Sequence, residues 1–150
     1  MSQKANLRAL REMTGLTQSD IAEMLKVHIN TVKNWEHPAH AQTAPAILYE
    51  KLKSILATRK QIVQFVLNNN DFDTNNANKI TLTFYRDQEE YNKYGRDEGN
   101  YKLANANTLA VAKALLDTGK TLDDIEFCYP TENKNLYQKT NINKINNTPI

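Results

Sequence analysis

The 150-residue chain has 40% hydrophobic and 24% charged residues and a net charge of +2. This composition is typical of a globular protein, and no apolar stretch approaches the length of about 18 residues that a membrane span requires. The single cysteine excludes an internal disulfide or a cysteine-rich zinc site, and residues 1–6 lack the apolar core of a signal peptide, so a cytoplasmic protein is predicted.

Charge is distributed unevenly along the chain. Residues 1–70 carry nine Lys/Arg against five Asp/Glu, a net charge of +4, whereas residues 71–130 carry seven against eleven, a net charge of −4. A basic first half and an acidic second half favour a function in which the first half meets a polyanion and the second does not.

The first segments of the chain have the spacing of short helices. Leu7, Leu10 and Met13 follow one another in three-residue steps, so we expect them on one buried face. Residues 17–20 (TQSD) form a capping-box pattern, in which the threonine hydroxyl and the aspartate carboxylate each satisfy a backbone amide. A second short helix is therefore predicted to begin there.

A third helix is predicted over Ile29–Glu36, with Val32 and Trp35 on its inner face because they lie three residues apart. A long helix of about twenty residues follows from Pro45, a residue suited to a first helical turn. Its apolar stripe, in which Arg59 fills one missing step, consists of Leu48, Leu52, Ile55, Ile62 and Val66. We expect this stripe to contribute both to the helices before it and to the second half of the chain.

Residues 69–78 are rich in Asn and Asp, which predicts a linker because these side chains compete for local backbone hydrogen bonds. Beyond them the period changes to two, since Ile80, Leu82 and Phe84 alternate with other residues as in a half-buried strand. The last stretch, residues 131–150, is rich in Asn and Lys and predicts a disordered tail.

Between the strand and the tail, two more helices are predicted. A capping signal at residues 87–90 (DQEE) begins a helix that Gly95 ends. The Ala/Leu-rich stretch Ala104–Asp117 predicts a helix closed by Gly119, and the apolar residues within 125–129 predict a second short strand. The second half of the chain is therefore expected to be small and α+β.

Three stretches of the first half combine into a longer pattern. Residues 7–11 (LRALR), 15–22 (GLTQSDIA) and 31–36 (TVKNWE) place three short helices with a tight turn between the second and the third. In this order and spacing they resemble the Cro/CI-type (Xre-like) helix-turn-helix family. The layout of the whole chain is similar to that of YdiL-like proteins, a group that includes the autorepressors associated with anti-CRISPR genes (Aca-type).

These resemblances imply a mainly α fold. An N-terminal, lambda-repressor-like helix-turn-helix bundle would cover residues 1–68 and include the long connecting helix from about residue 45. The linker at 69–78 would lead to a small α+β domain at 79–130, which the resemblance makes a dimerisation domain.

The resemblance also assigns roles to individual residues. Amide side chains can pair with adenine, lysine with guanine, and isoleucine can touch a thymine methyl group. The residues expected at base edges lie on the third helix: Ile29, Asn30, Lys33 and Asn34. The residues expected at phosphates lie near the starts of the second and third helices: Thr17, Gln18, His28 and Thr31.

Positive charge is expected around this face from Lys4, Arg8, Arg11, Lys26 and Lys33. The chain departs from the family pattern at two places where a glycine is common. The turn before the third helix contains Lys26 and Val27, and the residues after Trp35-Glu36 are His37 and Pro38. The third helix must therefore begin and end without these glycines.

The sequence thus predicts a DNA-binding repressor that binds an inverted repeat as a homodimer, with half-sites about one helical turn, roughly 34 Å, apart. The alternative is an antitoxin-like interaction module whose acidic second half neutralises a partner protein. No enzyme, cofactor, metal site or membrane contact is expected. The sequence has no phosphate-cradling glycine loop or nucleophile elbow, and His37 and His40 have no cysteine or carboxylate partner at ligand spacing.

Overall fold

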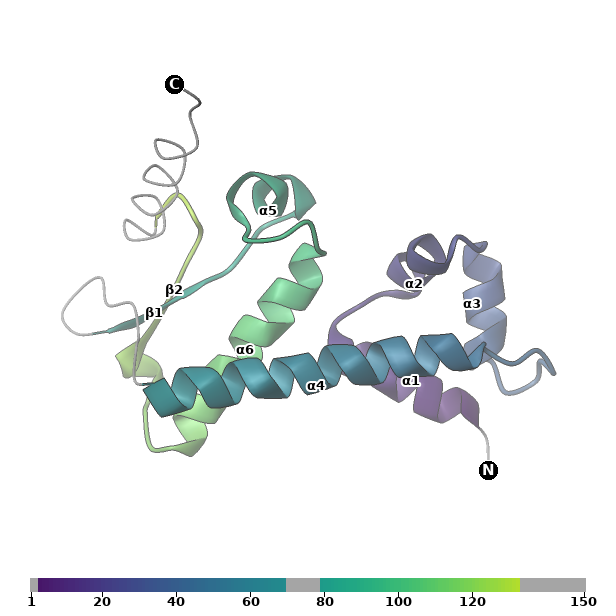
Figure 1. Cartoon of the computed structure of the whole chain (residues 1–150), viewed down its shortest axis with the longest axis horizontal. Coiled ribbons are helices and arrows are strands. Elements are labelled where there is room, and N and C mark those ends of the chain that lie inside the picture. Colours follow the sequence, from purple (N-terminus) through teal and green to yellow (C-terminus); the bar gives the residue numbers. More distant parts are fainter. Residues whose placement is uncertain (1–2, 70–78, 133–150) are drawn as a thin grey trace, which may run out of the picture. The chain divides into compact units, whose positions relative to one another are not determined.

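A computed structural model describes residues 3–69 and 79–132 (Figure 1). The chain divides into two compact units, residues 1–61 and the residues from Ile62 onward. Within the described residues the fold is mainly helical with one two-stranded sheet, which confirms the predicted fold class. The expected linker, apart from the backbone of Asn69, and the expected tail from residue 133 lie outside the described residues.

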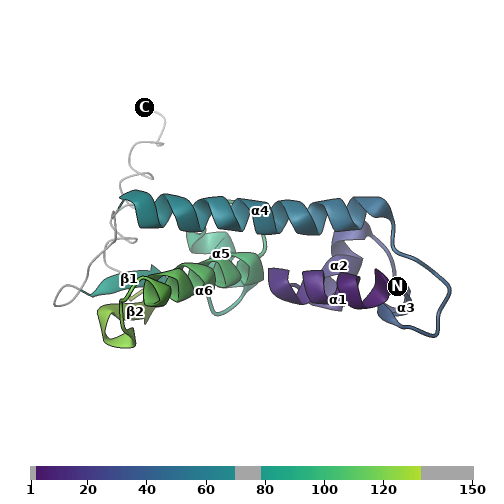
Figure 2. The ribbon, with the colours of Figure 1, turned by 90° about the horizontal axis from the view of Figure 1, so that it is seen from below.

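The first unit is built from three short helices and the first part of a long one: α1 (Gln3–Thr14), α2 (Gln18–Leu25), α3 (Ile29–Glu36) and α4 (Ala46–Asn69). The predicted capping box is present, because the Thr17 hydroxyl accepts from the Asp20 amide and the Asp20 carboxylate accepts from the Thr17 amide. The bounds of α3 are those predicted. Helix α4 runs without a break from Ala46 to Asn69 (Figure 2).

The buried face of α1 differs from the predicted one. Leu7 is buried, but Met13 is 61% exposed, and the face continues instead through Arg11 and Thr14. Around the helix axis, two steps of three residues place a side chain about 120° away from the starting residue. A step of four followed by a step of three brings it back to within about 20° of that residue. The prediction for Met13 was therefore wrong for a geometric reason.

Apolar side chains from all four helices and from the α1–α2 connection form the core of the first unit: Leu7, Leu16, Ile21, Ala22, Val32, Trp35, Leu48 and Leu52. Arg59, which interrupts the apolar stripe of α4, also belongs to this unit. Its guanidinium donates hydrogen bonds to the carbonyls of Met13 and Thr14 at the end of α1. These carbonyls lack partners within their helix, so a cation stabilises them.

The second unit contains the remaining elements: β1 (Ile80–Thr83), α5 (Gln88–Tyr94), α6 (Tyr101–Asp117), the short 3₁₀ helix η1 (Leu122–Asp124) and β2 (Ile125–Cys128). The two strands pair in parallel, with Ile80 opposite Ile125. Parallel strands cannot be joined by a tight turn, and α5 and α6 form the crossover between them (Figure 1).

The core of the second unit joins the sheet to α6 and to the end of α4. The buried residues are Ile80, Val111, Ala112, Leu115 and Ile125, and the α4 residues packed against them are Ile62, Val63, Val66 and Leu67. The stripe of α4 therefore contributes to both units, as predicted.

Two details of the second unit differ from expectation. Thr81 is as buried as Ile80, so the burial of side chains along β1 does not alternate as predicted. Helix α6 begins at Tyr101, three residues before the predicted start, because the Asn100 side chain accepts a hydrogen bond from the Lys102 amide at 2.8 Å.

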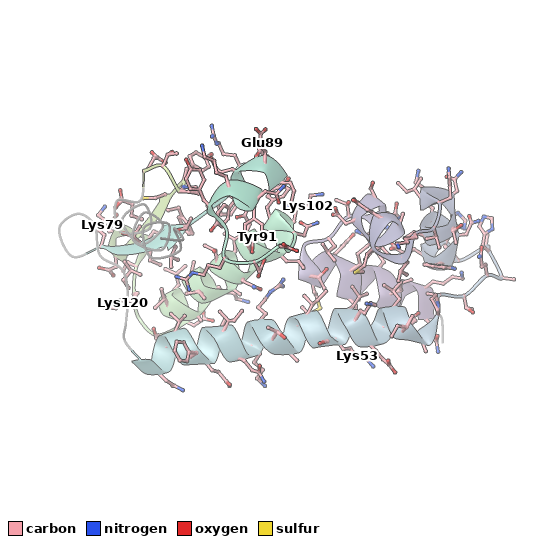
Figure 3. All side chains as sticks on the ribbon, turned by 45° about the horizontal axis from the view of Figure 1, so that its top comes forward. Lys53, Lys79, Glu89, Tyr91, Lys102 and Lys120 are labelled. Carbon is pink, nitrogen blue, oxygen red and sulfur yellow. The ribbon has the colours of Figure 1, made fainter. Side chains whose placement is uncertain are left out.

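Helix α5 begins and ends as predicted, with Asp87 as its cap and Gly95 after its last residue. Glu89 points away from the unit and Tyr91 lies on the inner side of the helix (Figure 3). The Tyr91 ring meets the Tyr85 ring edge-on at a centroid distance of 4.8 Å.

Candidate nucleic-acid interface

The turn between α2 and α3 uses a lysine where the family pattern has a glycine. Lys26 has φ of 55° and ψ of 44°, the left-handed conformation, and it is the one non-glycine residue with positive φ in the described chain. The amides of Lys26 and Val27 return to the carbonyl of Ala22, which closes the end of α2. The turn is therefore formed without glycine, at the cost of a strained backbone at Lys26.

The first turn of α3 is capped by a histidine. The Nδ1 atom of His28 accepts a hydrogen bond from the amide of Asn30 at 3.1 Å, and the ring itself is exposed. His28 thus satisfies one of the free amides that begin the helix. The His28 side chain, which is predicted to contact phosphate, is therefore held at the N-terminal end of α3, the positive end of the helix dipole.

Helix α3 has one buried side and one exposed side. Val32 is fully buried and Trp35 is 6% exposed, which confirms their predicted place in the core. Of the four residues predicted at base edges, Asn30 and Lys33 are exposed and Ile29 and Asn34 are half-buried. Thr31, predicted at a phosphate, is also half-buried. The polar side of α3 is therefore presented to solvent by the packing of its opposite side.

The start of α2 carries the other two predicted phosphate contacts. Thr17 is exposed, and its hydroxyl belongs to the capping box. Gln18 is half-buried, and its side-chain amide donates to Glu36 Oε1 at 3.3 Å. This hydrogen bond fixes Gln18 at the N-terminus of α2, against the last residue of α3.

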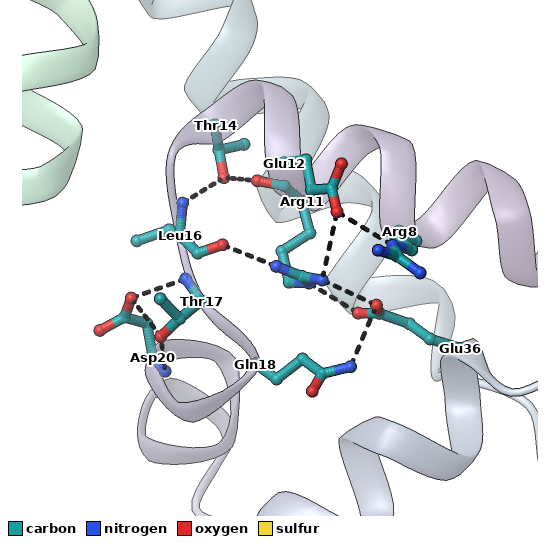
Figure 4. A network of polar contacts seen from close by, with 9 residues as sticks. All are labelled: Arg8, Arg11, Glu12, Thr14, Leu16, Thr17, Gln18, Asp20 and Glu36. Atoms are coloured by element: carbon teal, nitrogen blue, oxygen red, sulfur yellow. Dashed lines mark hydrogen bonds and ion pairs between the residues drawn. The ribbon is translucent and has the colours of Figure 1, made fainter.

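A buried polar network connects the three helices (Figure 4). Arg11 Nε and Nη2 donate to the two carboxylate oxygens of Glu36 at 2.7 and 2.9 Å, and Nη1 donates to the Leu16 carbonyl at 3.0 Å. The hydrogen bonds to the Glu36 carboxylate raise the pKa of Arg11 above its ordinary value. Such paired, fully hydrogen-bonded charges fix the geometry of neighbouring elements.

Not all five predicted cations lie at the exposed face of the helix-turn-helix. Arg11 is 9% exposed and bound to Glu36, and the Lys4 ammonium donates to backbone carbonyls. Arg8 is exposed but pairs with Glu12 at 2.9 Å. Lys26 and Lys33 are exposed as expected. The prediction for Arg11 was wrong because its acceptor, Glu36, comes from a distant part of the chain. Lys4 is half-buried and bound to carbonyls, so its place at the DNA-facing side stays a prediction.

Sequence reasoning missed Glu36 as a positioning residue. The helical period offered a signal, because Arg11 lies four residues after buried Leu7 and therefore needs an acid nearby. Glu36, at the end of α3, is that acid, 25 residues further along the chain.

Residues 3–69 and 79–132 contain no cluster of three or more His, Cys, Asp or Glu side chains suited to a metal ion. None of the helices described has both the length and the apolar character to cross a membrane.

The buried side of α3, its polar outer side and the tight α2–α3 turn define a helix-turn-helix protein. The family model described as Aca2/YdiL-like matches residues 2–118, which is most of the chain. The protein therefore belongs to the Aca2/YdiL-like family, which confirms that predicted resemblance and indicates an anti-CRISPR-associated regulator. No curated protein matches the chain. The resemblance to the wider Cro/CI-type family remains a prediction.

Proposed function

We propose that the protein is a repressor that binds double-stranded DNA in a sequence-specific manner by inserting α3 into the major groove. The observation that carries this proposal is the division of α3 into two sides. Val32 and Trp35 anchor one side, while Asn30 and Lys33 project from the other. A groove about 12 Å wide accepts such a helix, and amide and ammonium groups can pair with base edges there.

The charges of the first unit support the same proposal. Lys26 lies in the turn that precedes α3 and Lys33 lies on α3 itself, and both side chains are exposed. Neutralising phosphates with such cations releases counterions, so binding should weaken as the salt concentration rises. The half-buried Gln18, at the start of α2, is suited to a phosphate because free amides and a helix dipole accompany it.

A single copy of α3 is too short to contact enough base pairs for selective binding. We therefore propose a homodimer that recognises an inverted repeat. The second unit has a surface suited to this contact. A cavity of about 380 Å³ is bordered by apolar side chains that are 42–51% exposed, namely Leu109, Phe127 and Tyr129. In a two-fold dimer the same surface of each copy meets its counterpart, so one apolar surface per chain is sufficient.

In-vitro selection from random duplex DNA, with the full chain as bait, tests the proposal. We expect an enriched inverted repeat whose half-site centres lie one helical turn apart or a multiple of it, about 34 Å for one turn. Light scattering of the free protein should give the mass of a dimer. Selection that enriches no sequence would contradict specific binding. An enriched single half-site together with a monomeric mass would contradict the dimer while leaving the role of α3 intact.

A further inference from the structure

Helix α3 ends without the glycine that commonly closes such a helix. The residue after Glu36 is His37, whose φ of −88° and ψ of 123° are extended rather than left-handed. In the usual glycine-closed end, backbone amides that fold back satisfy the last carbonyls of the helix. Within the described part of the chain, the His37 amide folds back in this way, at a long 3.3 Å from the Asn34 carbonyl.

A side chain from α1 takes the place of those amides. The Lys4 ammonium donates to the Asn34 carbonyl at 2.9 Å and to the Trp35 carbonyl at 3.4 Å. It also donates to the Gln42 carbonyl at 2.7 Å, in the loop of residues 37–45 that joins α3 to α4. An ammonium has three hydrogens, so it can donate to these three acceptors at once.

We infer that Lys4 is a positioning residue of the recognition helix, which fixes the C-terminal end of α3 and the following loop to α1. Its positive charge lies at the negative end of the α3 dipole, where a cation is most favourable. Trp35, whose carbonyl it binds, also anchors the inner side of α3 in the core. Lys4 thereby determines how Asn30 and Lys33 are presented, without itself contacting DNA.

This inference rests on the proposed function only in its last step, because the contacts of Lys4 exist in the free protein. The first experiment therefore uses the wild-type full chain without DNA. We expect the ¹⁵N NMR signal of the Lys4 ammonium to exchange slowly with water, because its hydrogens are held by carbonyl oxygens. An ammonium signal exchanging as fast as that of exposed Lys113 would overturn the inference.

The second experiment compares variants. Lys4→Gln removes the charge and one of the three hydrogens, so we expect acrylamide to quench the single tryptophan, Trp35, more strongly than in the wild type. Affinity for the selected operator should fall by about tenfold, the size of a favourable cation contact at a helix end. The slope of log K against log salt should stay unchanged, because no phosphate contact is lost. Lys4→Arg, which retains charge and donors, should restore the wild-type quenching.

Two lysines serve as controls. Lys33→Gln should lower the affinity for the operator through loss of a base contact, and should leave Trp35 quenching unchanged. Lys113→Gln, on α6, should change neither. A Lys4→Gln variant with wild-type quenching would overturn the inference. A salt slope reduced by about 0.9 in this variant would identify Lys4 as a phosphate contact and would overturn it as well. If Lys4→Gln does not fold, the ammonium NMR signal decides the question on the wild type. If the wild type binds no DNA at all, the proposed function fails, whereas the NMR and quenching results still decide the role of Lys4.

Discussion

Arg11 and Glu36 form a buried, two-pronged ion pair that joins α1 to the last residue of α3. The distances are 2.7 Å from Nε and 2.9 Å from Nη2, and the Glu36 side chain is 4% exposed. Gln18 donates to the same carboxylate, so the last turn of α1, the start of α2 and the end of α3 meet at one acid. The geometry of the proposed DNA-binding surface therefore depends on a pair of charges that does not face DNA.

Removing one partner of this pair should be costly. Arg11→Met leaves the Glu36 carboxylate buried without its cation, and we expect a loss of about 3–5 kcal/mol in the free energy of unfolding. Urea denaturation measures it. Arg8→Met is the matched control, because the pair of Arg8 with Glu12 is exposed and should contribute little. Replacing both partners, in Arg11→Met with Glu36→Leu, should recover much of the loss. Equal stabilities of the Arg11 and Arg8 variants would refute a structural role for the pair.

The left-handed residue in the α2–α3 turn gives a prediction of opposite sign. Lys26→Gly removes a side chain from a backbone with φ of 55°, and we expect the free energy of unfolding to rise by up to about 1 kcal/mol. Lys26→Val should lower it, since a β-branched side chain is disfavoured there. Thermal unfolding of the three proteins gives the order. A glycine variant less stable than the wild type would show that the lysine side chain stabilises the turn by another contact.

The second unit should lose stability at alkaline pH. Burial, and then the hydrogen bond from its hydroxyl to the Asp97 carboxylate, raise the pKa of Tyr91 well above its ordinary value of 10.0. Above pH 10 the unfolded chain releases this proton and the folded chain keeps it, so the stabilisation is complete below pH 10 and is lost as the pH rises further. The expected slope is about 1.4 kcal/mol per pH unit from this tyrosine.

Unfolding by urea between pH 9 and 11 checks this slope. Tyr91→Phe removes the ionising group while retaining the ring that packs against Tyr85, so the dependence of stability on pH should be shallower in the variant. Parallel curves for the wild type and the variant would mean that Tyr91 ionises as readily in the folded chain as in the unfolded one.

Substitutions on α3 and α2 should separate base contacts from phosphate contacts. Asn30→Ala should cost about 1–3 kcal/mol of binding to the selected operator and relax the preference at one base position. Because Asn30 is exposed, the stability of the protein should not change. Gln18→Ala should weaken binding to all sequences alike. Repeating the DNA selection with each variant gives the result, and a uniform loss for Asn30→Ala would assign that residue to the backbone instead.

Introducing one charged side chain by substitution tests the proposed dimer surface. Leu109 is 51% exposed on α6, so Leu109→Glu should leave the fold of the monomer intact. In a two-fold interface the new carboxylates would be buried close together. We therefore expect the dissociation constant of the dimer to rise by at least about a hundredfold. Analytical ultracentrifugation measures this change, with Glu89→Gln on the exposed side of α5 as the control. A dimer of unchanged strength would place the interface elsewhere.

The local features of this protein follow from short stretches of its sequence. The capping box at Thr17, the bounds of α3, and the cap and end of α5 each depend on residues within a few positions of one another. Short-range hydrogen bonds and helical periodicity are sufficient for such features. The family resemblance also rested on short motifs at fixed spacing.

Long-range packing, in contrast, selects which charged and polar side chains remain available at the surface. Arg11 meets Glu36 across 25 residues, Lys4 reaches Gln42 across 38, and Arg59 binds the end of α1 across 46 and 45. The parallel pairing of β1 with β2 is decided at the same level. A residue's own neighbours in sequence do not specify such partners, because a long side chain is directed by the carbonyls and carboxylates that packing brings within hydrogen-bonding distance.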